Sequence, residues 1–154
     1  MKSLWAILFI FLFSLSSSAQ FNCDELLDDC EFYSCVEEEK HCGKRGYMMA
    51  FGKKYCMKFQ TEIDRFSENG KVWVSNVRLC LIDKMNNTDE TLSCKKFKKA
   101  QVKSHLPCYV ESGYCSLSGK DKRSINKVIL KSLWKPSLIF AGLRVLGSCL
   151  GNHL

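Results

Sequence analysis

The sequence predicts an all-α fold, a disulfide-stapled bundle of about five to six helices in a single domain. Apolar residues recur at every third or fourth position over most of the chain, which is the period of a helix with one buried face. The 154 residues include 10 cysteines, far more than a reduced cytosolic protein normally carries. Only 2 prolines occur, and no internal repeat or low-complexity tract indicates a second domain.

The first element in the chain is a leader. A single lysine precedes an almost unbroken apolar run over residues 4–15, and small residues then lead to Ala19. We therefore expect a signal peptide at residues 1–19 and a mature domain at 20–154. A membrane span needs about 20 apolar residues, and the later apolar stretch 138–150 contains an arginine and several small residues. The sequence thus predicts a secreted, extracellular protein with no membrane span.

The mature chain begins with a strongly acidic segment. Residues 21–40 hold eight acidic residues against one lysine, whereas the chain from residue 41 onward holds 21 basic and eight acidic residues. One interpretation is that the acidic segment packs beside the basic body, where opposite charges lower self-repulsion. The other is a cation-binding or receptor-binding acidic face, but Asp24 and Asp28 lack the glycine and alternating oxygen ligands of a calcium loop. We expect no metal site and no cofactor.

Two helical stripes follow and are expected to pair as an antiparallel hairpin. The first extends from 47 to 66, where large apolar residues alternate with lysines and acids at helical spacing. The segment 67–70 reads Ser-Glu-Asn-Gly and is expected to form a turn, because Asn and Gly tolerate the left-handed conformation. The second stripe extends from Trp73 to Lys84.

Further helices are expected after residues 85–88 break this pattern. Thr88 or Asp89 is a suitable cap for the next one. Pro107 fits the first turn of another, which Ser118-Gly119 would end.

The last helical stripe begins near Ile125 and approaches Pro136. That proline either breaks the helix or begins a final one that continues to Cys149.

Five lysines crowd the helix expected after Asp89. Clustered ammonium groups attract anions, so sulfated glycans or an acidic protein surface are candidate partners, and a merely solvated helix face is the alternative. Aromatic residues are not interleaved with them as single-stranded nucleic acids require, and we expect no nucleic-acid partner. The candidate anionic-partner patch consists of Lys95, Lys96, Lys98, Lys99 and Lys103.

An enzyme of the phospholipase A2 type is an alternative, because small helical secreted enzymes are also rich in cysteine. That chemistry needs a histidine followed by an aspartate, and here His41 is followed by Cys42. The other two histidines, His105 and His153, stand in no recognisable Ser-His-Asp or Cys-His arrangement. All three are expected on the surface, and we expect no catalysis.

The cysteines carry the most information. Their spacing lacks the close pairs of a zinc ribbon or a redox motif. An even number in a secreted chain implies five bridges, but ten cysteines allow roughly a thousand pairings and spacing alone does not choose among them. The ten are Cys23, Cys30, Cys35, Cys42, Cys56, Cys80, Cys94, Cys108, Cys115 and Cys149.

The order of these cysteines, with Gly46-Tyr47, Phe59, Phe66 and Gly70-Lys71 between them, resembles the stanniocalcins over nearly all of the mature chain. Vertebrate members have a further cysteine that links two chains. This chain has none after Cys149, so we expect no covalent dimer, and a noncovalent dimer stays open. The pairing that the resemblance implies is Cys23 with Cys35, Cys30 with Cys56, Cys42 with Cys94, Cys80 with Cys108, and Cys115 with Cys149.

The resemblance also implies a function. Stanniocalcins are secreted glycoprotein hormones associated with calcium and phosphate balance, and some inhibit pappalysin-type metalloproteinases. We therefore expect a hormone-like signalling protein with a cell-surface receptor as its partner, and the alternative is an inhibitor of an extracellular protease. Independently of the family, Asn86-Asn87-Thr88 is a glycosylation sequon in what is expected to be a surface loop, so Asn86 is a candidate glycan site.

Overall fold

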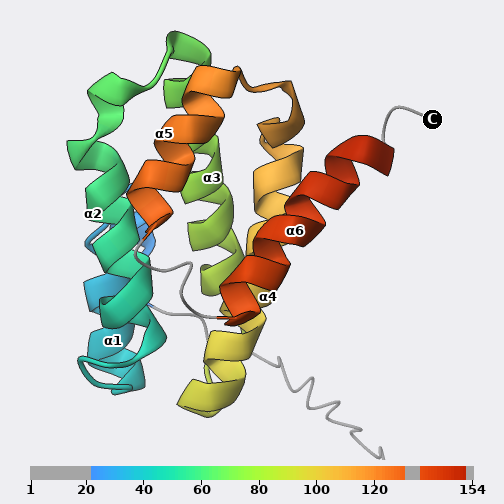
Figure 1. Cartoon of the computed structure of the whole chain (residues 1–154). Helices are drawn as coiled ribbons and strands as arrows, with labels where there is room; N and C mark the ends of the chain where they lie inside the picture. The colour runs from blue at the N-terminus through green and yellow to red at the C-terminus, as the bar shows by residue number, and fades with distance from the viewer. Residues whose placement is uncertain (1–21, 131–135, 152–154) are drawn as a thin grey trace, which may run out of the picture.

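The computed structural model describes residues 22–130 and 136–151, and the expected leader lies outside them. The described residues form six α-helices with short 3₁₀ and π-helical turns and no strand (Figure 1). The predicted all-α, disulfide-stapled single domain is confirmed. None of the described helices is both long and apolar enough to span a membrane. The helices are α1 (Phe32–Lys40), α2 (Lys54–Thr61), α3 (Glu68–Asn86), α4 (Cys94–Glu111), α5 (Gly119–Ile129) and α6 (Pro136–Gly151).

The helix α5 packs against α2, α3 packs against α4, and α6 crosses α4 obliquely (Figure 1). The chain runs up α2 and back down α3, as the predicted hairpin requires, and the rings of Phe59 and Trp73 meet with centroids 6.4 Å apart. The expected helix over 47–66 is helical in three pieces: the π-helical turn η2 (Met48–Lys53), α2, and the 3₁₀ turn η3 (Ile63–Arg65).

The first helix, α1, packs against η2 at one glycine. A Cβ added to Gly52 would lie 2.3 Å from the ring of Tyr33, which is far closer than two such atoms can approach. Only glycine therefore lets η2 come this near to α1.

The expected turn at residues 67–70 is wrong, because these residues begin α3. Ser67 is the N-cap, and its hydroxyl oxygen accepts a hydrogen bond from the Gly70 N–H at 3.2 Å. The buried carboxylate of Asp121 accepts from the Ser67 N–H at 2.8 Å and from the Ser67 hydroxyl at 2.7 Å. It also accepts from the hydroxyl of Ser118, the N-cap of α5, at 2.6 Å. One carboxylate thus ties the starts of α3 and α5 together.

The helix boundaries expected around α4 are also wrong. The N-cap is Ser93, not Thr88 or Asp89. The carboxylate of Asp89 instead accepts hydrogen bonds from the N–H and the hydroxyl of Thr91 in a turn.

Pro107 lies inside α4, which continues to Glu111 before Gly113, at φ 95°, ends it. Ser118 and Gly119 begin α5 and do not end a helix. Proline costs a helix interior about 3 kcal/mol, and the packing of α4 between α3 and α6, with a disulfide at the next residue, offsets it. Of the two alternatives left open for Pro136, the structure shows the second, since Pro136 begins α6.

The core divides into two apolar clusters. One joins α1 and η2 to the second half of α3 and to Phe97 of α4. The other joins the first half of α3 to α5, Tyr114 and Val145 of α6. Residues of both clusters meet around the centre of the bundle, where the candidate site lies.

Candidate functional site

Five disulfides hold the bundle together and use all 10 cysteines. Their Cα atoms lie 5.2 to 6.0 Å apart, within the ordinary range for a disulfide. Bridges of this kind stabilise a fold by about 2–4 kcal/mol each. The pairs are the five that the stanniocalcin resemblance implies: Cys23–Cys35, Cys30–Cys56, Cys42–Cys94, Cys80–Cys108 and Cys115–Cys149.

The structure places all five lysines of the candidate patch on α4 and exposes them to solvent. Lys95, Lys99 and Lys103 recur at every fourth residue and so form one row along the helix. The opposite side of α4 carries Phe97 and Gln101, which are buried. No ion pair joins these lysines to any described residue.

The exposed side of α4 that carries these five lysines, here called the lysine face, is unfavourable for the stability of the helix. The first turn of α4 contains Lys95 and Lys96 and no acidic residue. Cations near a helix N-terminus oppose the helix dipole, and like charges four residues apart repel, each by a few tenths of a kcal/mol or more. Helix stability therefore does not explain the lysine face, whereas an anionic partner would.

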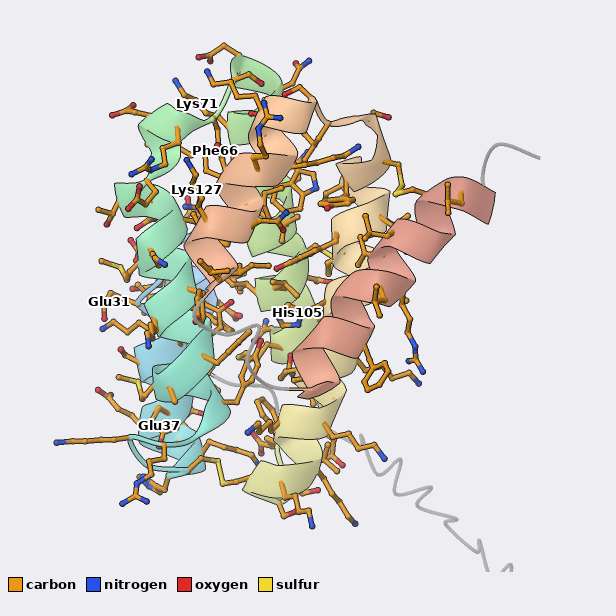
Figure 2. The ribbon with its side chains drawn as sticks, in the orientation of Figure 1. Glu31, Glu37, Phe66, Lys71, His105 and Lys127 are labelled. Atoms are coloured by element: carbon orange, nitrogen blue, oxygen red, sulfur yellow. A yellow bond between two sulfur atoms is a disulfide. The ribbon has the colours of Figure 1, made fainter. Side chains whose placement is uncertain are left out.

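The acidic first segment is only partly helical. Asp24 and Glu25 lie in a 3₁₀ turn and Asp28 in the turn after it, so these acids do not share one α-helical face. Glu31 forms an ion pair with Lys53 of η2 at 2.7 Å, and Figure 2 shows its side chain on the outside of the bundle. This contact agrees with the packing of the acidic segment beside the basic body.

One group of potential metal-ligand atoms occurs among the described residues, at Cys23, Cys35 and Glu39. The two sulfur atoms are joined in a disulfide and offer no thiolate to a metal.

The centre of the bundle contains a cavity of about 60 Å³ that is partly open to solvent. It lies between the two core clusters and takes its wall from α1, η2 and α2 to α5. Most of this wall is aromatic or aliphatic. The apolar side chains that line it include Phe51, Tyr55, Phe59, Trp73, Val77, Leu81 and Ile129.

Tyr33, Tyr47, Tyr109 and Arg78 supply polar groups to the wall, as do Gln60, His105 and the hydroxyl of Tyr55. Burial raises the pKa of Tyr33, and negative charge on Tyr109 would raise it further, while Arg78 acts in the opposite direction. Burial also raises the pKa of Tyr47 well above its usual value and the pKa of Tyr109 to about 12. All three tyrosines line the cavity together with Arg78, and all three phenols stay protonated at neutral pH.

The expectation that every histidine is on the surface is wrong for His105. His105 lines the cavity, and its ring meets Phe51 at a centroid distance of 5.6 Å and Tyr109 at 5.7 Å (Figure 2). Burial lowers its pKa, although backbone hydrogen bonds act in the opposite direction. Nδ1 lies 2.9 Å from the Gln101 carbonyl oxygen, which can only accept, so Nδ1 carries the proton of the neutral ring. His41 is exposed, as expected, and His153 lies outside the described residues.

The expected surface loop at the sequon is wrong. Asn86 is the last residue of α3 and is only 7% exposed. Its Nδ2, the atom to which a glycan would be attached, donates to a carboxylate oxygen of Asp24 at 3.4 Å. A glycan there requires the end of α3 to open, so this burial counts against glycosylation.

Sequence reasoning missed the cavity residues. The sequence pattern did not single out Arg78 as a cavity residue, because it directly follows Val77 of the apolar stripe of α3. One charged residue beside such a stripe is usually solvated. A charged residue within an apolar helical stripe was the one available signal.

No model of a known family, no curated protein and no solved structure matches this chain.

Proposed function

We propose that this chain is a secreted, hormone-like signalling protein that acts by binding an acidic partner outside the cell through the lysine face of α4. Five bridges in a small helical domain are typical of proteins that work in oxidising surroundings. The observation that carries the proposal is the exposed, unpaired row of Lys95, Lys99 and Lys103, which destabilises its own helix. The process we propose, calcium and phosphate balance, rests on the stanniocalcin resemblance alone.

An acidic patch on a receptor or a sulfated glycan fits this row. Lysines at every fourth helical residue lie about 6 Å apart, which allows several to contact anionic groups together. Charge pairing of this kind mainly raises the association rate and weakens with salt, because exposed charges are screened over about 8 Å at physiological ionic strength.

Binding of the labelled, oxidised protein to intact cells tests this proposal. The test variant carries Lys95→Glu, Lys99→Glu and Lys103→Glu together. We expect saturable binding by the wild type, at least tenfold weaker binding by this variant, and a change in cellular calcium or phosphate uptake that follows binding.

The matched control changes the same charge elsewhere. Lys44, Lys120 and Lys127 are exposed and do not form a row, so their triple replacement by Glu should change affinity less than threefold. Equal losses in both triple variants would show that net charge alone matters and would contradict the lysine face. Unsaturable binding, or a tight one-to-one complex with an extracellular metalloproteinase and no effect on ion uptake, would contradict the hormone-like role.

A further inference from the structure

Some of the polar groups around the central cavity have no hydrogen-bond partner among the described residues. Within residues 22–130 and 136–151, no group forms a hydrogen bond with the hydroxyl of Tyr33, Tyr47 or Tyr109. Tyr33 and Tyr47 are only 3% and 4% exposed. The Nε of Arg78 is buried and likewise has no partner in this part of the chain. A buried polar group left unpaired costs about 1–3 kcal/mol, so the unpaired Nε of Arg78 at this cavity indicates a place where a bound molecule is held.

The charge of the wall indicates an anion. Arg78 is the only charged side chain among the described residues that line the cavity, since His105 is neutral and the phenols stay protonated. A guanidinium presents parallel N–H donors that match the two oxygens of a carboxylate. The tyrosine hydroxyls can donate to the same oxygens, because neither they nor Arg78 pair with an acid among the described residues.

The apolar part of the cavity wall determines the chemistry of the uncharged part of the ligand. Phe51, Phe59 and Trp73 present ring surfaces, and Val77 and Leu81 continue the apolar lining. The cavity of about 60 Å³ is partly open to solvent, so it holds only part of a short chain, whose remainder extends into the opening, and it excludes a bulky ligand.

We propose that this cavity binds a small carboxylate with a short apolar chain, its charged end held by Arg78 and the hydroxyls of Tyr33, Tyr47 and Tyr109, and its chain lying against the aromatic wall. This site is separate from the lysine face, and either proposal can fail without the other.

Titration with hexanoate, followed by ¹H–¹⁵N NMR on the oxidised full domain, tests the proposal. We expect a one-to-one saturable change in the Arg78 Nε–H signal and in the Trp73 indole N–H signal, because both side chains line the cavity. Hexanol, which has the same chain without the charge, should bind at least tenfold more weakly. Absence of saturation with hexanoate, or equal affinity for hexanol, overturns the carboxylate site.

Two variants assign the binding to these residues. Arg78→Met keeps an unbranched side chain and removes the charge, and we expect at least a tenfold loss of hexanoate affinity. Tyr109→Phe removes one hydroxyl and should cost about threefold, which gives a smaller perturbation if Arg78→Met disturbs the fold. Arg45→Met is the matched control, because Arg45 is exposed and does not line the cavity. Wild-type affinity in both cavity variants, or equal losses in Arg45→Met, overturns the assignment.

Discussion

Replacing Asp121 by Asn removes the acceptor that joins the starts of α3 and α5. The carboxylate is fully buried, and its Oδ2 accepts from the hydroxyls of Ser67 and Ser118 at 2.7 and 2.6 Å. An amide keeps the shape and the Oδ1 acceptor for the Ser67 N–H but has no second acceptor. Each hydrogen bond to a charged group contributes about 1.5–3 kcal/mol. Part of this loss is offset, because the amide no longer buries a charge.

We therefore expect Asp121→Asn to lower the free energy of unfolding by about 2–3 kcal/mol, or the Tm by about 10 °C. The assay is urea unfolding of the oxidised protein at pH 7, followed by circular dichroism. Asp64→Asn is the matched control, since Asp64 is exposed, and should change stability by less than about 0.5 kcal/mol. An Asp121→Asn variant as stable as this control would refute the reasoning that one buried carboxylate holds both helix starts.

The same carboxylate sets a pH dependence at low pH. Burial raises the pKa of Asp121, but the hydrogen bonds from Ser118 and Ser67 outweigh it and hold the pKa below its usual value. The folded state thus binds the proton less readily than the unfolded state. The stability that the ionised Asp121 carboxylate contributes is present above about pH 4 and is lost as the pH falls through the pKa of Asp121 in the folded state. The stability difference between wild type and Asp121→Asn should shrink below pH 4.

Three other predictions concern separate parts of the fold. Burial lowers the pKa of His105, so the wild type should lose stability as the pH falls below about 6.5, and His105→Gln should flatten that slope in urea unfolding at pH 7.5 and 5.5. Because Asn86 is buried with its Nδ2 hydrogen-bonded, we expect the secreted protein to show no mass loss at Asn86 on treatment with peptide N-glycosidase. Replacing Cys115 and Cys149 together by Ser opens a loop of 34 residues and should cost about 4 kcal/mol of unfolding free energy by loop-closure entropy, measured by the same urea assay.

Local sequence patterns predicted the existence of the helices better than their ends. The apolar spacing of Phe59, Trp73 and Val77 was enough to place α2 and α3. The segment Asn69-Gly70 looked like a turn because those residues usually form one. Asp121, about fifty residues later, supplies the cap contact that makes the segment helical. A contact so distant along the chain has no local signature.

The helix break near Pro107 was misplaced for a related reason. Proline was expected to begin a helix, but α3 and α6 pack on either side of α4 and hold the proline inside it. The central cavity could not be predicted from the sequence for the same reason. Tyr33, Tyr47 and Tyr109 come from separate segments, and only the packing of those segments brings the three residues to one cavity.

Export and full oxidation of the chain are the premises of both the fold and the proposed function. Expression with the native leader, followed by intact mass and non-reducing peptide mapping of the protein in the medium, tests them directly. We predict a chain that begins at Gln20, has no free thiol, and contains the five bridges Cys23–Cys35, Cys30–Cys56, Cys42–Cys94, Cys80–Cys108 and Cys115–Cys149. A chain retained in the cell with free thiols, or a secreted chain with other cysteine pairs, would contradict both the fold and the proposed function.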